Sequence, residues 1–290
     1  MIQDIHPFKL HNEYRPGTMP SPDSIALHFS GGKLLCNITD QTLSFPRFKE
    51  LAKPPHQAVY IFSLDDCLDH QDFFLILDRK SLTEGISSDA PLNTYLYRTL
   101  KELREQSMGP RQLVFAAFTA SHLFHWYDTN RFCGSCGTAT THAYDERAVD
   151  CPACKRRFYP RIQPAVIVGV TNKDRLLITR YANRPLAMPA LVAGFTEIGE
   201  TLEETVAREV MEEAGLKVKN IRYYKSQPWG IADDILAGFY CDVDGDDTIH
   251  MDASELKEAV WVPREEITGQ PDDFSLTNEM MMRFRAGKKC

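Results

Sequence analysis

The sequence predicts a mixed α+β and α/β protein in which a short cysteine-rich segment separates two larger domains. Three observations predict this class. Short β-rich runs and one helical run fill the N-terminal part, two Cys-x2-Cys pairs follow, and strand and helix patterns alternate through the rest. A chain of 290 residues suits this organisation because domains commonly hold about 100–200 residues. The predicted domains are an N-terminal α+β domain at 1–130, the cysteine segment at 131–160 and a C-terminal domain at 161–290.

The N-terminal domain is predicted to contain a hairpin, two further strands and one helix. Apolar residues on both sides of a Gly-Gly pair predict a hairpin over 24–36. Short β-rich runs predict strands at 57–64 and 72–78, and apolar residues with helical spacing predict a helix within 107–130. The domain shows no catalytic motif, so we expect a structural or dimerising role for it.

Strand and helix patterns alternate through the C-terminal domain, which favours helices packed on a mixed sheet. The predicted elements are strands at 163–171, 175–180 and 235–243, a helix at about 202–214 that follows a glycine-containing segment at 190–200, a strand within 255–267 and a last helix at 276–287.

Charge and hydropathy limit the partners that the chain can have. It carries 33 Lys and Arg against 40 Asp and Glu, a formal net charge of −7. This balance argues against a protein that holds long nucleic acid through a general positive field. No apolar stretch approaches the roughly 18 residues of a membrane span, and no export signal is evident at the start. We therefore expect a cytoplasmic protein with no membrane partner and no DNA partner.

Four of the eight cysteines form two Cys-x2-Cys pairs: Cys133, Cys136, Cys151 and Cys154. Four thiolates at this spacing can surround one Zn²⁺ per chain as a ribbon of two knuckles. Because protein fills all four positions, we expect a structural ion, which would supply the folding energy of a segment with little core. Unliganded thiols or a redox pair are the alternative. The scattered cysteines, Cys36, Cys67, Cys241 and Cys290, are expected to be free thiols, either buried or terminal.

Basic and aromatic side chains interleave at the end of the cysteine segment. They are Lys155, Arg156, Arg157, Phe158, Tyr159 and Arg161. Such a mixture can contact RNA. It also suits a solvated ribbon edge whose aromatic residues pack on a neighbouring domain, and the sequence favours this second interpretation.

Three glutamates crowd one predicted helix face in the C-terminal domain. Glu209, Glu212 and Glu213 have i, i+3 and i+4 spacing, at which like charges cost about 0.2–0.5 kcal/mol per pair. Glu200 lies in the preceding loop. Carboxylate oxygens on a rigid element suit Mg²⁺ or Mn²⁺, which would relieve the repulsion and bridge phosphate oxygens. We expect Arg208 to orient one of these glutamates through a bidentate pair.

The ends of this helix also carry sequence signals. Thr201 followed by Glu204 has the capping-box pattern, and Gly215 is suited to end the helix. Its buried stripe is expected to comprise Leu202, Val206 and Val210.

Residues 194–216 read GFTEIGETLEETVAREVMEEAGL, with the residues and spacing of the Nudix box. The C-terminal domain therefore resembles a Nudix hydrolase domain, an α/β/α sandwich. The resemblance implies that metal-activated water attacks a phosphorus of a nucleoside diphosphate linked to another group. It makes Glu209 and Glu213 the main metal ligands and Glu212 a third ligand or the general base. The complete set of glutamates argues against a non-catalytic nucleotide sensor.

Features outside the Nudix box indicate which family of Nudix hydrolases the chain resembles. A four-cysteine ribbon and a further domain precede the Nudix domain, and SQPW stands at 226–229. Together they resemble the NADH pyrophosphatase family, which splits NAD(H) into NMN(H) and AMP and in some members removes NAD caps from RNA 5′ ends. That family usually continues SQPWPFPxS, whereas this chain reads SQPWGIADD. The departure leaves ADP-ribose or another nucleoside diphosphate derivative open as the substrate.

The resemblance also implies individual contacts. Phe195 would stack on the nicotinamide, and Glu146 and Tyr159 would reach the site of a partner subunit in a homodimer. The backbone carbonyl of Ala193 and the side chain of Glu255 would add metal ligands. The remaining pocket positions are Gln227, Trp229 and Asp234, with Thr277 near the base. A core position for Phe195 and simple packing of Trp229 are the alternatives.

Overall fold

A computed structural model describes residues 1–39, 42–66, 69–83, 91–106, 109–182 and 188–288. The chain forms two compact units. The first comprises 2–161 together with 230–233, and the second comprises Met1, 162–229 and 234–290. The Cys-x2-Cys pairs thus lie in the first unit and the glutamate helix lies in the second.

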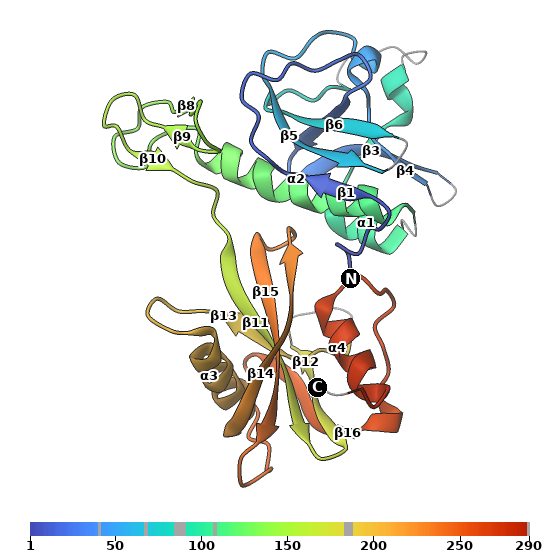
Figure 1. The fold of residues 1–290 in the computed structure, drawn as a ribbon, viewed down its shortest axis with the longest axis vertical. Helices are drawn as coiled ribbons and strands as arrows, with labels where there is room; N and C mark the ends of the chain where they lie inside the picture. Colours follow the sequence, from blue (N-terminus) through green and yellow to red (C-terminus); the bar gives the residue numbers. More distant parts are fainter. Residues whose placement is uncertain (40–41, 67–68, 84–90, 107–108, 183–187, 289–290) are drawn as a thin grey trace. The chain divides into compact units, whose positions relative to one another are not determined.

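The first unit contains a seven-stranded sheet in the order β1-β5-β6-β2-β3-β4, with β7 paired to β3 (Figure 1). Strands β2 and β6 are parallel, and the other pairs are antiparallel. The strands are β1 (Lys9–His11), β2 (Ile25–Ser30), β3 (Lys33–Thr39), β4 (Thr42–Ser44), β5 (Ala58–Asp65), β6 (His70–Ile76) and β7 (Leu96–Arg98).

The predicted hairpin of this unit is confirmed. Strands β2 and β3 pair around Gly31 and Gly32, both of which have positive φ. Strands β5 and β6 confirm the two further strands, whereas β1, β4 and β7 were not predicted because each has only three residues.

Two helices accompany this sheet, α1 (Leu100–Gln106) and α2 (Arg111–Thr129). Helix α2 confirms the predicted helix, although residues 107 and 108 of that range lie outside the described part of the chain. The Phe124 ring of α2 stacks on Phe29 of β2 with centroids 4.7 Å apart, so α2 packs on the sheet. None of the described helices is long and apolar enough to cross a membrane.

The ribbon, residues 131–160, adds a small sheet of order β10-β9-β8 to the same unit. Its strands are β8 (Thr141–His142), β9 (Val149–Asp150) and β10 (Arg157–Phe158). One Arg147 nitrogen donates to the carbonyls of Asn12 (3.0 Å) and Ile61 (2.8 Å). The Tyr14 hydroxyl donates to the Ala143 carbonyl at 2.6 Å. These bonds tie the ribbon to the seven-stranded sheet.

The second unit contains a six-stranded sheet in the order β14-β15-β11-β12-β16, with β13 paired to β11 (Figure 1). The strands are β11 (Gln163–Asn172), β12 (Arg175–Tyr181), β13 (Val192–Phe195), β14 (Val218–Trp229), β15 (Asp234–Val243) and β16 (Leu256–Pro263), and the helices are α3 (Leu202–Ala214) and α4 (Leu276–Arg285). The predicted strands and helices are present, and β13 and β14 were not predicted.

Alternate residues of β11 enter two separate cores. Ile167 packs in the core that contains Met280 of α4, whereas Val166 packs in the core that contains Val210 of α3. Helices α3 and α4 therefore cover opposite faces of the sheet, as Figure 1 shows. The predicted α/β/α sandwich is confirmed.

The scattered cysteines fall into two groups. Cys36 and Cys241 are buried free thiols, and burial raises the pKa of each to about 12. Cys67 and Cys290 lie outside the described residues.

Candidate active site and zinc ribbon

Helix α3 is fixed at both ends by its own sequence. The Thr201 hydroxyl accepts from the Glu204 amide at 3.2 Å, and the Glu204 carboxylate accepts from the Thr201 amide at 2.8 Å. Gly215 ends the helix in the left-handed region, with φ of 69°. Val206 and Val210 are fully buried, and the partly buried Leu202 packs against the same core. A helix held in this way keeps its polar side chains in fixed positions.

The guanidinium of Arg208 gathers the carboxylates around α3. It makes a bidentate pair with Glu200, from Nε to Oε1 at 2.6 Å and from Nη2 to Oε2 at 2.9 Å. Nη1 donates to Glu209 at 2.8 Å and to Glu212 at 2.9 Å, and Nη2 also donates to the Phe195 carbonyl at 2.9 Å. This arrangement lowers the pKa of the Glu200 carboxyl to about 2.

The three glutamates of α3 lie in different surroundings. Glu209 and Glu213 are buried, with 9% and 2% of their surface exposed, whereas 58% of the Glu212 side chain is exposed. Glu209 and Glu212 both contact Nη1 of Arg208, as expected for residues that crowd one face, but Glu212 is mostly exposed to solvent. The buried pair is the part of the helix that needs a compensating charge.

The carboxyl of Glu213 lies in an environment that a cation would stabilise. Burial raises its pKa to about 8, and the charges of Glu209 and Glu255 act in the same direction, while a hydrogen bond from the Ala193 backbone amide lowers it. Its Oε2 atom is buried and has no hydrogen-bond partner among the described residues. Burial also raises the pKa of Glu209. Buried carboxylates without sufficient partners favour a bound cation, so these residues fit Mg²⁺ or Mn²⁺.

Gly194 makes room for the Glu209 side chain. A Cβ atom at position 194 would lie 2.0 Å from the Glu209 carboxylate. Gly194 stands in β13, opposite Val166 of β11, so the sheet fixes its position. Any larger residue would displace either the carboxylate or the strand.

Sequence reasoning missed one acidic residue near this pair. The charge of Asp252 also raises the pKa of Glu213, and its backbone amide donates to the Glu213 carbonyl at 3.0 Å. Its only sequence signal is its position three residues before Glu255.

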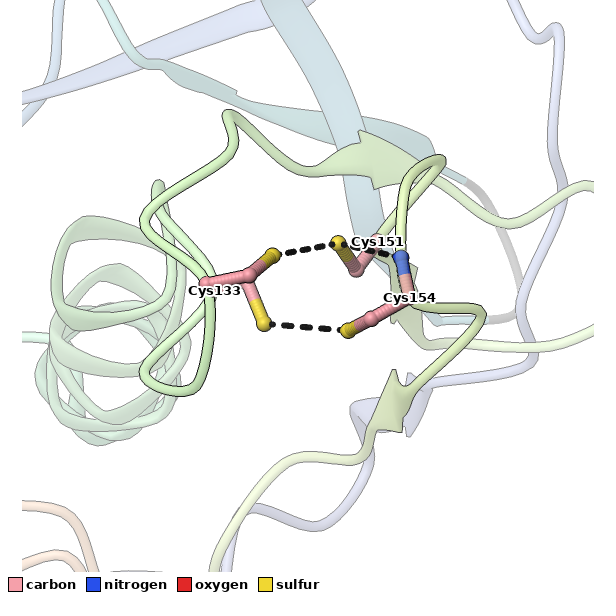
Figure 2. A group of neighbouring side chains, drawn as sticks. Cys133, Cys151 and Cys154 are labelled. Carbon is pink, nitrogen blue, oxygen red and sulfur yellow. Dashed lines mark hydrogen bonds between the residues drawn. The ribbon is translucent and has the colours of Figure 1, made fainter.

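The four paired cysteines come together in the ribbon. The sulfurs of Cys133 and Cys154 lie 3.5 Å apart, and those of Cys136 and Cys151 lie 3.4 Å apart. Figure 2 shows the side chains of Cys133, Cys151 and Cys154 pointing toward one another. Across the described ranges, these cysteines are the one group of three or more His, Cys, Asp or Glu side chains whose ligand atoms all lie within 4.8 Å of one another. Four convergent sulfurs suit tetrahedral Zn²⁺.

An arginine in the ribbon is surrounded by acidic side chains. Arg157 forms ion pairs with Asp145 (2.9 Å), Glu146 (2.6 Å) and Asp150 (2.8 Å). The Tyr159 hydroxyl donates to the same Glu146 oxygen that Arg157 contacts, at 2.8 Å. The structure thus brings Glu146 and Tyr159 together, and it offsets the charge of Arg157 within the protein.

The expected pocket positions on β14 and β15 are largely inside the protein. The Gln227 amide nitrogen donates to the Phe274 carbonyl and its oxygen accepts from the Leu276 amide, both at 2.7 Å. Trp229 is partly buried against the core that contains α4, and Asp234 is buried at the start of β15. Gln227 therefore holds β14 to Phe274 and to the first residue of α4.

Phe195 and Thr277 lie at the ends of elements. The Phe195 ring, at the end of β13, is 50% exposed and is therefore outside the core. Thr277 lies in the first turn of α4. An exposed ring beside the Arg208 cluster can serve as a stacking surface.

Comparison with known proteins gives two family matches and a set of curated relatives. Residues 161–283 match the NUDIX domain, and residues 128–159 match the NADH pyrophosphatase zinc ribbon domain. Three relatives carry the name NAD-capped RNA hydrolase NudC. The protein from an Enterobacter species is 41% identical over 170 residues, which cover 56% of this chain and 66% of that protein.

The protein from Photobacterium profundum is 39% identical over 165 residues, covering 57% of this chain and 62% of the relative. The protein from Pectobacterium atrosepticum is 37% identical over 183 residues, covering 63% of this chain and 69% of the relative. The match to the first two relatives thus spans somewhat less than two thirds of their length.

Proposed function

The chain belongs to the NADH pyrophosphatase family of Nudix hydrolases, and from this premise we propose that it hydrolyses the diphosphate of NAD(H) to NMN(H) and AMP. One observation carries the proposal. Buried Glu209 and Glu213 on α3 lie beside the Arg208 cluster, in a chain that also has the family's zinc ribbon. The names of the relatives support a second substrate, the NAD cap at an RNA 5′ end.

The chain's own residues supply charge and orientation to this reaction. Glu209 and Glu213, with Glu255, would hold Mg²⁺ or Mn²⁺. When bound, the ion would neutralise negative charge that develops on the diphosphate. Arg208 keeps Glu209 in place, and the exposed ring of Phe195 offers a flat surface to a nicotinamide or adenine.

A substrate panel tests the proposal. We expect the purified protein with Mg²⁺ or Mn²⁺ to release AMP from NADH and NAD⁺, with a higher kcat/KM than for ADP-ribose or dinucleoside polyphosphates. Higher kcat/KM for ADP-ribose would favour the alternative that the GIADD sequence after Trp229 leaves open. No release of AMP from NADH or NAD⁺ would reject the assignment.

Arg208→Lys should lower kcat/KM for NADH by about 10–100-fold, the usual cost of losing a group that orients metal ligands. Lysine keeps the positive charge but cannot reproduce the forked contacts to Glu200, Glu209 and Glu212. An activity titration with Mn²⁺ should also show a higher half-saturating concentration.

Arg222→Lys is the matched control for Arg208→Lys. Arg222 makes a bidentate pair with Asp242 between β14 and β15, with both distances 3.1 Å. The Arg222→Lys substitution should leave the half-saturating concentration of Mn²⁺ unchanged. Equal effects of the two substitutions would show that Arg208 contributes only to stability.

A homodimer in which Glu146 and Tyr159 reach the partner's site, a cytoplasmic location and the three-part domain division remain predictions. The family resemblance supports the prediction of a homodimer.

A further inference from the structure

A pocket of about 400 Å³ lies in the first unit, whereas the glutamate helix belongs to the second. We name it the α2–ribbon pocket. It forms where the last turn of α2 meets the start of the ribbon and the ends of β5 and β6. Its lining includes Gln57, Arg79, Tyr127, Arg131, Phe132 and His142.

The two charged side chains in this lining are arginines, Arg79 and Arg131, and their guanidinium groups can donate hydrogen bonds to a ligand. The Arg79 side chain is 73% exposed, and its nearest ion-pair partner, Asp128, is 3.9 Å away. Arg131 lies 3.7 Å from the same Asp128 oxygen and donates a second nitrogen to the Leu77 carbonyl at 2.9 Å. Distances of 3.7 Å and 3.9 Å are too long for hydrogen bonds. The two guanidinium groups can therefore accommodate a phosphate.

Three rings, those of Tyr127, Phe132 and His142, also line the pocket. Phe132 is 62% exposed, and a backbone bridge to Ala139 holds its position. The Tyr127 and His142 rings lie 5.1 Å apart with an interplanar angle of 38°. Exposed rings beside cationic groups are the combination on which unpaired bases stack while their phosphates bind nearby.

A larger cavity in the same unit, about 520 Å³, lacks this character. Its lysine, Lys49, pairs with Asp23 at 2.6 Å, and its Glu50 accepts from the Arg47 amide at 2.7 Å. The lysine of this larger cavity is thus already paired at hydrogen-bond distance, whereas Arg79 of the α2–ribbon pocket has its nearest carboxylate 3.9 Å away.

We propose that the α2–ribbon pocket binds one nucleotide of single-stranded RNA. The base would stack on Phe132, and the phosphate would contact Arg79 and Arg131. The pocket chemistry by itself specifies a nucleotide, and the choice of RNA over a free mononucleotide rests on the proposed action on NAD-capped RNA. This site would recognise the RNA body, separately from the dinucleotide at α3.

The test measures binding of a short single-stranded RNA with a 5′ NAD cap and a 3′ fluorophore, by anisotropy without added Mg²⁺ or Mn²⁺, so that the RNA stays intact and the ribbon keeps its zinc. Arg79→Glu and Phe132→Ala should each raise Kd by about tenfold or more, as loss of a stacking or phosphate contact does. Arg79→Glu should also flatten the dependence of log Kd on log salt. With Mn²⁺ present, the ratio of kcat/KM for capped RNA to that for NADH should fall in both variants.

Matched controls lie in the same unit. Lys33→Glu reverses an exposed charge at the start of β3, and Tyr144→Ala removes a ribbon ring that is 81% exposed. Both should bind the RNA as the wild type does. Kd values for the pocket variants equal to those of the controls would overturn the proposal.

Two further measurements distinguish a wrong RNA assignment from a wrong assignment of the proposed activity. Unlabelled RNA without the cap should compete for the pocket better than AMP does. If the variants lose affinity for AMP while their Kd for RNA is unchanged, the RNA assignment is overturned. If the wild type does not hydrolyse NADH but the variants still lose RNA affinity, the proposed activity fails and the RNA site stands.

Discussion

Glu213→Gln is expected to reduce NADH hydrolysis by at least about a hundredfold, since loss of even an orienting partner of a metal ligand costs about 10–100-fold. Glutamine has nearly the same shape but no negative charge, so it would weaken the hold on Mg²⁺ or Mn²⁺. The expected measurement is kcat at saturating metal, together with the affinity for Mn²⁺ in the absence of substrate. Activity equal to that of the wild type would remove α3 from the mechanism.

The same substitution should leave the protein folded. Glu213 is 2% exposed and its Oε2 atom has no hydrogen-bond partner among the described residues, so the metal-free protein bears the cost of a buried carboxyl group. A neutral glutamine removes part of that cost. Without bound Mg²⁺ or Mn²⁺, the melting temperature of Glu213→Gln should therefore be equal to or above that of the wild type.

Glu203→Gln is the control for Glu213→Gln. Glu203 is an exposed glutamate in the first turn of the same helix, so the same change should alter neither kcat nor metal affinity. A fall in melting temperature for Glu213→Gln would mean that its loss of activity reports unfolding.

Signals in the local sequence were sufficient to predict most of the helices and strands of the second unit. The cap at Thr201, the stop at Gly215 and the apolar stripe specify α3 within the chain itself, and the structure places the helix at these residues. Strand β14 carried no comparable signal. Its exposed and partly buried residues do not alternate regularly, Asn220 has positive φ, and the register shifts twice. It forms because β15 offers it an edge, which is a tertiary effect.

The candidate site shows the same division between local and tertiary information. Spacing along α3 identified the glutamates, but it could not show that Glu212 lies in solvent while Glu209 lies against Gly194. That difference depends on β13, which its pairing with β11 places beside α3. Gln227 is a similar case, because its bonds to Phe274 and to the start of α4 connect residues far apart in the sequence.

Cys133→Ser is expected to abolish the binding of one zinc ion per chain and to destabilise the first unit. Structural Zn²⁺ contributes about 10–16 kcal/mol in small zinc peptides, and the ribbon's own sheet has strands of only two residues. The effect should extend beyond the ribbon. If the ribbon unfolds, Arg147 leaves the carbonyls of Asn12 and Ile61, and the seven-stranded sheet loses those contacts. Elemental analysis and thermal unfolding would measure the two effects.

Cys36→Ser separates loss of metal from loss of packing. Cys36 is a buried thiol in β3 of the same unit, with 1% of its surface exposed. The change to serine should lower stability, because a hydroxyl is then buried, while the zinc content stays at one ion per chain. Retention of zinc by Cys133→Ser, or its loss from Cys36→Ser, would show that the ion is not held by the ribbon. Because α3 belongs to the other unit, Cys133→Ser should leave the affinity of the glutamates for Mn²⁺ intact if the units fold independently.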